Sequence, residues 1–139
     1  MAIQQVVLLG GLLSLAMMGY IFLSSQSQGE QTSISPPLLS QQLQAKHDIK
    51  RLNNALLVYK IDNGVYPTNV QNLSALEYHP IKHPIPKRWN MLGYMKSIPL
   101  DPWGQPYQYR RASGGGSVDV YSLGADGALG GSGAATDIR

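Results

Sequence analysis

The feature that most constrains this chain is an uncharged apolar run near its N-terminus. Positions 6–23 read VVLLGGLLSLAMMGYIFL, without a single Asp, Glu, Lys or Arg. This length approaches the roughly 20 residues that an α-helix needs to cross a bilayer. The segment before the run contains no Lys or Arg, and the SSQSQ after it is a poor match to a signal-peptide cleavage site. Residues 1–24 are therefore predicted to form a transmembrane anchor rather than a cleaved signal peptide.

A polar segment separates this anchor from the rest of the chain. It is rich in Ser and Gln and ends in Pro36 and Pro37, which deny the preceding backbone a helical continuation. We therefore expect a linker at 25–37 and a globular domain at 38–139. Hydrophobic residues make up 43% of the chain and charged residues 14%, and the apolar run accounts for most of that imbalance. The remaining residues suffice for one compact core and no more.

The domain begins with the pattern of an amphipathic helix. Apolar residues recur at spacings of four and three, which places them on one helical face: Ala45, Ile49, Leu52, Leu56 and Tyr59. The helix is expected to end near Asp62. Asn63 and Gly64 can adopt the left-handed conformation that closes a helix, and Pro67 prevents its resumption.

A shorter helix is predicted next. Thr68 and Gln71 have the spacing of a capping box. The apolar face that follows consists of Val70, Leu73 and Leu76. The helix should end before Pro80, because residues 79–89 hold three prolines and must run as a surface loop.

The second half of the domain has the signals of a turn and a hairpin. Asp101-Pro102-Trp103-Gly104 fits a type I turn with Trp103 packed beneath it. Residues 107–111 and 118–122 are rich in Tyr and Val and are predicted strands, joined through the glycines at 114–116. The tail from Gly124 consists mostly of small residues, so it buries too little apolar surface to order itself unless something ties it down.

Two carboxylates in this glycine-rich tail suggest a cation. Asp126 precedes Gly127, and Asp137 follows eleven residues later. Calcium takes six to eight oxygen ligands, accepts backbone carbonyls and tolerates irregular geometry. The alternative is structural, because Asp-Gly is a common turn dipeptide and Asp137 can simply be solvated. The spacing of an EF-hand is absent, so the residues taken alone favour the turn.

Other chemistries find no support. The chain has no cysteine, which excludes disulfides, thiolate metal sites and a cysteine nucleophile. His79 and His83 have helical spacing, but Pro80 precludes that helix, so we interpret them as loop residues rather than zinc ligands. The net charge of +3 is scattered and gives no nucleic-acid-binding stripe. No nucleophile elbow or phosphate-binding loop is present, so an enzyme is not predicted.

Three motifs in a fixed order give the chain a family resemblance. They are YKIDNGVYPT at 59–68, LDPWGQPYQY at 100–109 and YSLGADG at 121–127. With them, residues 45–138 closely resemble the major pseudopilin of bacterial type II secretion systems, in the type IV pilin-like superfamily. The resemblance implies an α+β, pilin-like fold. In that fold an N-terminal transmembrane helix precedes an amphipathic helix, which packs on a small antiparallel sheet with a C-terminal calcium loop.

The resemblance also implies a function. It is that of a structural subunit of a periplasmic filament, the pseudopilus, which drives export of folded proteins. The subunit would sit in the bacterial inner membrane with its domain in the periplasm, and would associate with itself, other pseudopilins and inner-membrane secretion components. The implied calcium (Ca²⁺) ligands are the Leu123 carbonyl and the carboxylates of Asp126 and Asp137, with further carbonyls after Gly131.

The sequence departs from the family pattern in three respects. It begins MAIQQ, with Gln5 where the family has glutamate, so the charge pairing expected in the filament is missing. Pro36 and Pro37 should interrupt a helix that is continuous in the family. Family members often have an acidic residue at the position of Ser132 or of Thr136. This chain has none at either position, so its calcium binding should be weaker. Two alternatives follow: a non-assembling, membrane-tethered module that binds or caps the secretion machinery, or, with least support, a DNA-uptake pilin.

Overall fold

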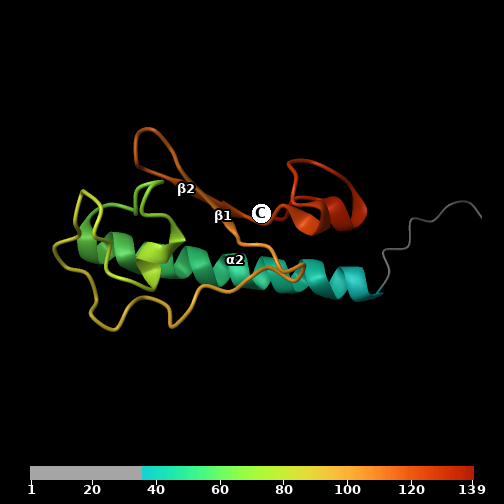
Figure 1. The fold of residues 1–139 in the computed structure, drawn as a ribbon, viewed down its shortest axis with the longest axis horizontal. Coiled ribbons are helices and arrows are strands. Elements are labelled where there is room, and N and C mark those ends of the chain that lie inside the picture. Colours follow the sequence, from blue (N-terminus) through green and yellow to red (C-terminus); the bar gives the residue numbers. More distant parts are fainter. Residues whose placement is uncertain (1–35) are drawn as a thin grey trace, which may run out of the picture. The chain divides into compact units, whose positions relative to one another are not determined.

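The computed structural model describes residues 36–139. These comprise one long helix, a two-stranded sheet and three short 3-10 helices (Figure 1). The predicted anchor at 1–24 and all but the last two residues of the predicted linker lie outside the described residues. No helix of the described part is both long enough and apolar enough to cross a membrane.

Helix α2 (Pro36–Asn63) forms the base of the domain. It begins at the two prolines, which suit a first helical turn because their missing N–H groups would find no intrahelical acceptor there. The helix ends as predicted: Gly64 takes a φ of 77°, and its N–H donates to the Lys60 carbonyl oxygen at 2.7 Å. All five apolar residues of the predicted face are buried, which confirms the helical period: Ala45, Ile49, Leu52, Leu56 and Tyr59.

The predicted capping box is present. The Thr68 N–H donates to Gln71 Oε1 at 2.9 Å, and the Gln71 N–H donates to Thr68 Oγ1 at 3.1 Å. The helix after it is only the short 3-10 helix η1 (Leu73–Leu76), because Asn72 has a φ of 54° and breaks the helical path. The prediction that Val70 belongs to its apolar face is therefore wrong: Val70 precedes η1 and is 65% exposed.

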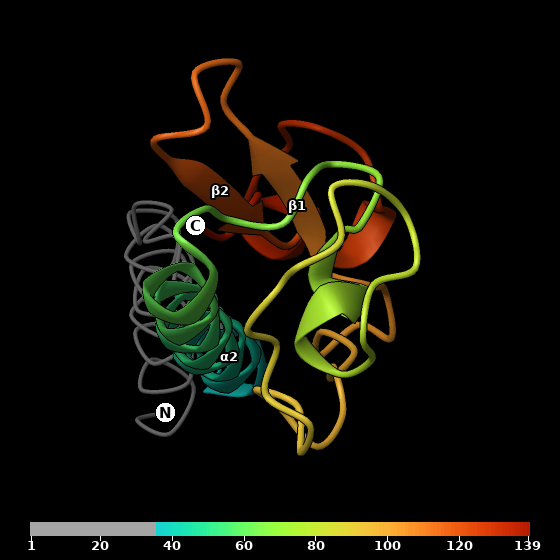
Figure 2. The ribbon, with the colours of Figure 1, turned by 90° about the vertical axis from the view of Figure 1, so that its left-hand side faces the viewer.

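Strands β1 (Gln108–Arg111) and β2 (Val118–Tyr121) form the predicted antiparallel hairpin. Gln108 lies opposite Tyr121, and Arg111 opposite Val118. Viewed along α2, the hairpin lies over one side of the helix and η1 lies beside it (Figure 2). Tyr107, just ahead of β1, is buried with the apolar face of α2, and the core closes between these elements.

The segment between η1 and β1 runs without helices or strands, as predicted for residues 79–89. It is fixed to the core by specific contacts. The indole N–H of Trp89 donates to the Ala75 carbonyl oxygen at 2.8 Å, and the N–H groups of Tyr94 and Met95 donate to the Leu76 carbonyl oxygen at 2.7 and 3.0 Å. This loop is therefore held against the domain although it has no regular structure.

Candidate metal site

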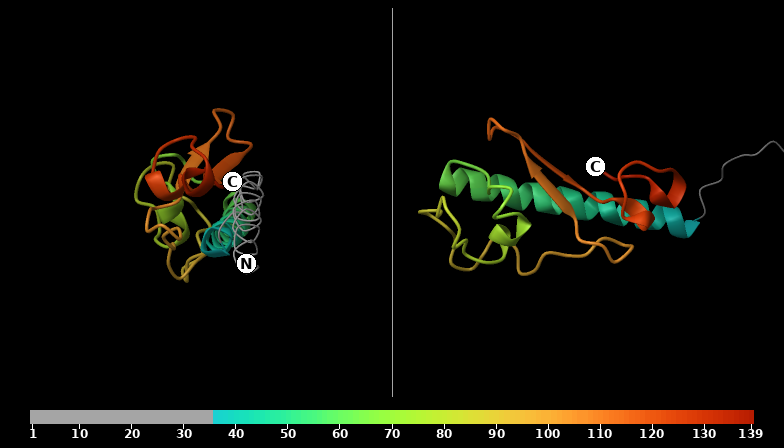
Figure 3. Two further views of the ribbon diagram at one scale, coloured as in Figure 1. Left: turned by 90° about the vertical axis from the view of Figure 1, so that its right-hand side faces the viewer. Right: turned by 45° about the horizontal axis from the view of Figure 1, so that its top comes forward.

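The C-terminal loop is closed at its base by one residue pair. The N–H of Ser122 donates to the Ile138 carbonyl oxygen at 2.9 Å, and the N–H of Ile138 donates to the Ser122 carbonyl oxygen at 3.0 Å. Between these residues, the 3-10 helices η2 (Gly124–Asp126) and η3 (Gly133–Ala135) pack against each other. Figure 3 shows the loop beside the first turns of α2. The Gln42 amide N–H donates to the Gly133 carbonyl oxygen there, at 3.1 Å.

Leu123 and Asp126 lie at the two ends of η2. Leu123 immediately precedes it and is half-buried, and Asp126 is its last residue and is exposed. Oδ1 of Asp126 accepts the N–H of Ala128 at 3.1 Å, and Gly127 takes a φ of 66°. The Asp-Gly pair thus forms a local turn. The second carboxylate oxygen of Asp126 is not part of that hydrogen bond, so the turn and a cation are compatible.

Asp137 has a less ordinary environment. Its Oδ1 is buried and has no hydrogen-bond partner among the described residues, while its Oδ2 lies 3.9 Å from a guanidinium nitrogen of Arg139. Burying a carboxylate oxygen without a partner is unfavourable unless a cation or a donor compensates it. This orphaned oxygen is the observation that best fits a bound cation.

Backbone carbonyl oxygens supply further potential ligands. A Cβ placed on Gly124, which has a φ of 69°, would lie 2.8 Å from the carbonyl oxygens of both Ala134 and Thr136. These oxygens therefore face the start of η2 across the loop. Like the carboxylates of Asp126 and Asp137, they are hard oxygen donors, a ligand type that suits calcium better than zinc or copper.

Side-chain clustering alone would not reveal this site. In residues 36–139, no group of three or more His, Cys, Asp or Glu is placed to hold a metal ion. His79 packs edge-on against Trp89 with ring centroids 5.3 Å apart. Among the described residues, a metal site would therefore need ligands other than these side chains, such as backbone carbonyls.

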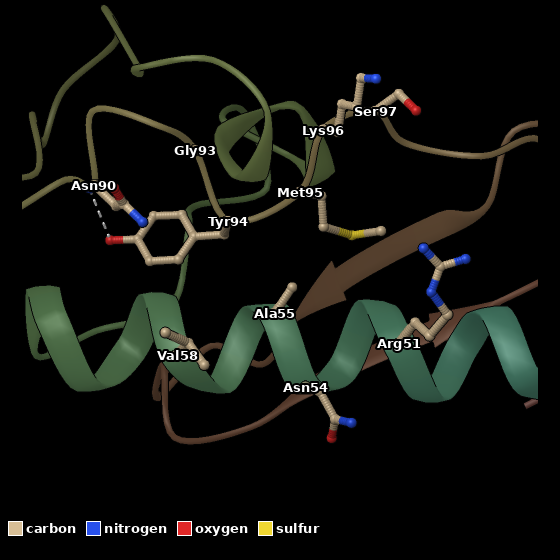
Figure 4. Close-up of a pocket in the computed structure, with 10 residues that line it drawn as sticks. All are labelled: Arg51, Asn54, Ala55, Val58, Asn90, Gly93, Tyr94, Met95, Lys96 and Ser97. Carbon is tan, nitrogen blue, oxygen red and sulfur yellow. Dashed lines mark hydrogen bonds between the residues drawn. The ribbon is translucent and has the colours of Figure 1, made fainter.

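A separate groove runs between α2 and the loop at 90–97 (Figure 4). Its cavity volume is about 700 Å³. Ala55 and Val58 of α2 face Tyr94 and Met95 of the loop across it, and the hydroxyl of Tyr94 accepts the Asn90 N–H at 3.3 Å. Its lining contains no carboxylate and no histidine.

Two polar residues that organise the domain were not recognised as such from the sequence. The sequence predicts only a capping role for Gln71, yet its amide also donates to the carbonyl oxygens of Lys82 and Pro84 at 2.8 and 2.7 Å. From the sequence, Ser122 is only the last residue of a predicted strand. In the structure it is fully buried and hydrogen-bonded to Asp101. Both roles depend on segments that meet only in the fold.

Comparison with known proteins gives consistent matches. The family model described as type II secretion system (T2SS), protein G matches residues 37–139. The type II secretion system core protein G of Pseudomonas aeruginosa is 52% identical over 94 residues, which cover 68% of this chain and 66% of that protein. The protein of the same name from Vibrio cholerae is 48% identical over 97 residues, covering 70% and 66%. The chain thus spans just under two thirds of the length of these curated relatives.

A solved structure shares the fold. It is the major pseudopilin from the type 2 secretion system of enterohaemorrhagic Escherichia coli, with 29% sequence identity and a TM-score of 0.68. The match covers 81% of this chain and 96% of that one. The pilin-like α+β architecture expected from the sequence is confirmed by this match.

Proposed function

The chain belongs to the type II secretion system protein G family, and from this premise we propose that it is a structural subunit of a pseudopilus. In this role copies of the chain assemble into a periplasmic filament that drives export of folded proteins. The observation that carries the proposal is the family match over residues 37–139, which spans all but the first of the described residues. The structural match to a major pseudopilin supports the same role. The proposed role is structural and not enzymatic.

The outward face of α2 supports assembly. Although its inner face is used by the core, the helix leaves large apolar side chains exposed near both of its ends: Leu39, Leu43, Leu57 and Ile61. Exposed apolar side chains of this size are typical of a surface that packs against another protein. A filament of identical subunits can bury such side chains at every repeat.

We further propose that residues 1–24 anchor the subunit in the bacterial inner membrane, with residues 36–139 in the periplasm. The uncharged apolar run at 6–23 supports the anchor. The partners in this proposal are other copies of the chain, other pseudopilins and inner-membrane secretion components.

The C-terminal loop is proposed to hold one calcium ion. Leu123 would contribute its carbonyl oxygen and Asp126 and Asp137 their carboxylates, with Ala134 and Thr136 available as further carbonyl ligands. The buried, unpartnered Oδ1 of Asp137 supports this set. When bound, the ion neutralises the carboxylates and links the two halves of a loop that has little apolar burial of its own.

Electron microscopy of the overexpressed chain tests the assembly proposal. We expect filaments from the parent and their loss in Ile61→Asp, because this residue is 71% exposed on the proposed packing face of α2. Ile81→Asp is the matched control: Ile81 is 86% exposed but lies in the loop after η1, so filaments should persist. Filaments that form equally in both variants would refute the α2 face as the packing surface.

A second candidate is a tethered module that does not assemble but binds or caps the secretion machinery. One sequence feature favours it: Pro36 and Pro37 stand where the family is expected to have a continuous helix, and proline opposes the continuation of a helix through it. The same microscopy separates the two candidates. A parent chain that stays monomeric at high expression supports the module, and abundant filaments exclude it.

A further inference from the structure

The hydroxyl of Ser122 is the centre of a buried polar chain. It donates a hydrogen bond to Oδ2 of Asp101, and it accepts the N–H of Gly124 at 3.1 Å. Ser122 has no exposed surface and Asp101 is only 4% exposed. Hydrogen bonds between buried polar groups are held tightly, because water cannot replace a lost partner.

Ser122 also touches both ends of the candidate calcium loop. Its side chain holds Gly124, which directly follows Leu123. Its backbone holds Ile138, which directly follows Asp137, through two hydrogen bonds. Ser122 therefore sets the distance between the two chain segments that carry the proposed ligands.

Asp101 in turn is fixed by the turn that follows it. Its Oδ1 accepts the N–H groups of Trp103 and Gln105 at 3.1 and 2.8 Å. The turn is closed by the Gly104 N–H, which donates to the Asp101 carbonyl oxygen at 2.9 Å. Because Oδ1 accepts the hydrogen bonds of this turn, Oδ2 is the oxygen that accepts from Ser122, 21 residues away in the sequence.

We propose that Asp101 is a positioning residue for calcium: through Ser122 it holds the C-terminal loop in the geometry that binds the ion. This inference rests on the proposed calcium site. The hydroxyl of Ser122 has one proton, and giving it to Asp101 leaves its lone pairs free to accept from Gly124. Gly124 in turn lies against the carbonyl oxygens of Ala134 and Thr136, so its position is coupled to theirs.

Asp101→Asn tests this link with little other change. The amide is isosteric and keeps an oxygen for the N–H groups of Trp103 and Gln105, so the turn should survive. Its NH₂ group, however, faces Ser122 as a donor, so the hydroxyl proton of Ser122 loses its buried acceptor and the link to Asp101 is broken. We expect calcium affinity to fall about tenfold. This is the lower end of the loss seen when a residue that positions metal ligands, without binding the metal itself, is substituted. Ser122→Ala should have the same effect.

The experiment is a calcium chloride titration of the 139-residue chain in detergent micelles, by calorimetry, with unfolding temperatures measured in chelator. Asp48→Asn is the matched control. Asp48 is also 4% exposed and hydrogen-bonded, but it contacts Gln44 and Tyr107 rather than Ser122. It should lower the unfolding temperature and leave calcium affinity unchanged. A merely structural role for Asp101 would give the same result as this control.

The double variant Asp101→Asn/Ser122→Ala adds a second check. If both residues act through one hydrogen bond, the double variant should bind calcium no more weakly than Ser122→Ala alone. Parent-like affinity in Asp101→Asn and Ser122→Ala would overturn the inference and leave the calcium site standing. A parent that shows no calcium binding would refute the site itself and the inference with it.

Discussion

The phenol oxygen of Tyr107 lies 3.4 Å from Oδ2 of Asp48 and donates a hydrogen bond to it. Both residues are buried, and the bond joins the chain just ahead of β1 to the inner face of α2. The same carboxylate oxygen accepts the Gln44 amide N–H at 3.0 Å, and Oδ1 lies 3.6 Å from the Arg51 guanidinium. The carboxylate is thus satisfied from several sides, as a buried charge must be.

This environment predicts a loss of stability at alkaline pH. Burial and the nearby carboxylates of Asp48 and Asp101 raise the pKa of Tyr107, and burial raises the pKa of Tyr109. Because the folded pKa values lie above the unfolded value of about 10, the two phenols contribute fully below about pH 10. Above it the unfolded chain releases protons that the folded chain retains, so the free energy of unfolding falls.

Urea unfolding between about pH 8 and about pH 11, followed by circular dichroism, measures this slope. Tyr109→Phe should make the fall shallower, because one of the two phenols is removed. A free energy of unfolding that stays constant through the alkaline range would contradict the prediction.

Gln71→Ala should destabilise the folded domain strongly, although Gln71 lies outside the helices and strands. Gln71 is 5% exposed, and its side-chain amide makes three hydrogen bonds: to the Thr68 N–H and to the carbonyl oxygens of Lys82 and Pro84. Truncation leaves buried partners unsatisfied, so we expect the free energy of unfolding to drop by about 1–3 kcal/mol. Urea unfolding measures it.

Gln108→Ala is the control for that loss. The Gln108 amide makes one exposed hydrogen bond, to the Pro106 carbonyl oxygen at 3.0 Å, so its removal should change stability by less than about 0.5 kcal/mol. Equal effects of the two substitutions would show that the contacts of Gln71 to the loop contribute nothing.

Gly131 and Gly130 form a natural pair for testing the shape of the C-terminal loop. Both have positive φ, 82° and 96°, so alanine at either position is strained by about 1–2 kcal/mol. A Cβ on Gly131 would also collide with the Ala135 carbonyl group, whereas one on Gly130 would meet nothing within 4 Å. Gly131→Ala should therefore lower the unfolding temperature distinctly more than Gly130→Ala. Thermal unfolding by circular dichroism compares them, and equal losses would mean that the loop is not held in this conformation.

Local patterns in the sequence predicted much of the fold. The spacing from Ala45 to Tyr59 identified the buried face of α2, and Thr68 with Gln71 identified the capping box. These features depend on helical geometry and hydrogen bonds over three or four residues, so the sequence contains them directly. Val70 was misplaced because nothing local announced the positive φ of Asn72 that shortens the helix.

The candidate site was only partly accessible in this way. Asp126 and Asp137 were recognisable as carboxylates in a glycine-rich tail, but the burial of the Asp137 oxygen appears only in the folded loop. The link from Asp101 to Ser122 likewise requires a turn and a strand end to meet. Such contacts are properties of the fold, and residue spacing does not encode them.

The last prediction is that calcium orders the C-terminal loop. The loop has two carboxylates, so its affinity should lie toward the weak end for calcium sites, about 10⁻⁴ to 10⁻³ M. At a tenfold excess over the dissociation constant, binding to the folded state alone adds about 1.4 kcal/mol of stability, so millimolar calcium should raise the unfolding temperature. Magnesium should do much less, because it prefers a compact octahedral site and sheds water reluctantly. Hydrogen exchange should slow in residues 123–137 and not in α2.

Asp126→Ala and Asp137→Ala should each abolish these calcium effects. In chelator Asp126→Ala should change little, because Asp126 is exposed, and Asp137→Ala should be neutral or slightly stabilising, because it removes a buried oxygen without a partner. Asp62→Ala, at the far end of α2, is the control and should retain the full calcium response. If chelator and excess calcium give the same unfolding temperature and the same exchange rates in the parent, the Asp-Gly turn is purely structural. The orphaned oxygen of Asp137 must then be satisfied by water.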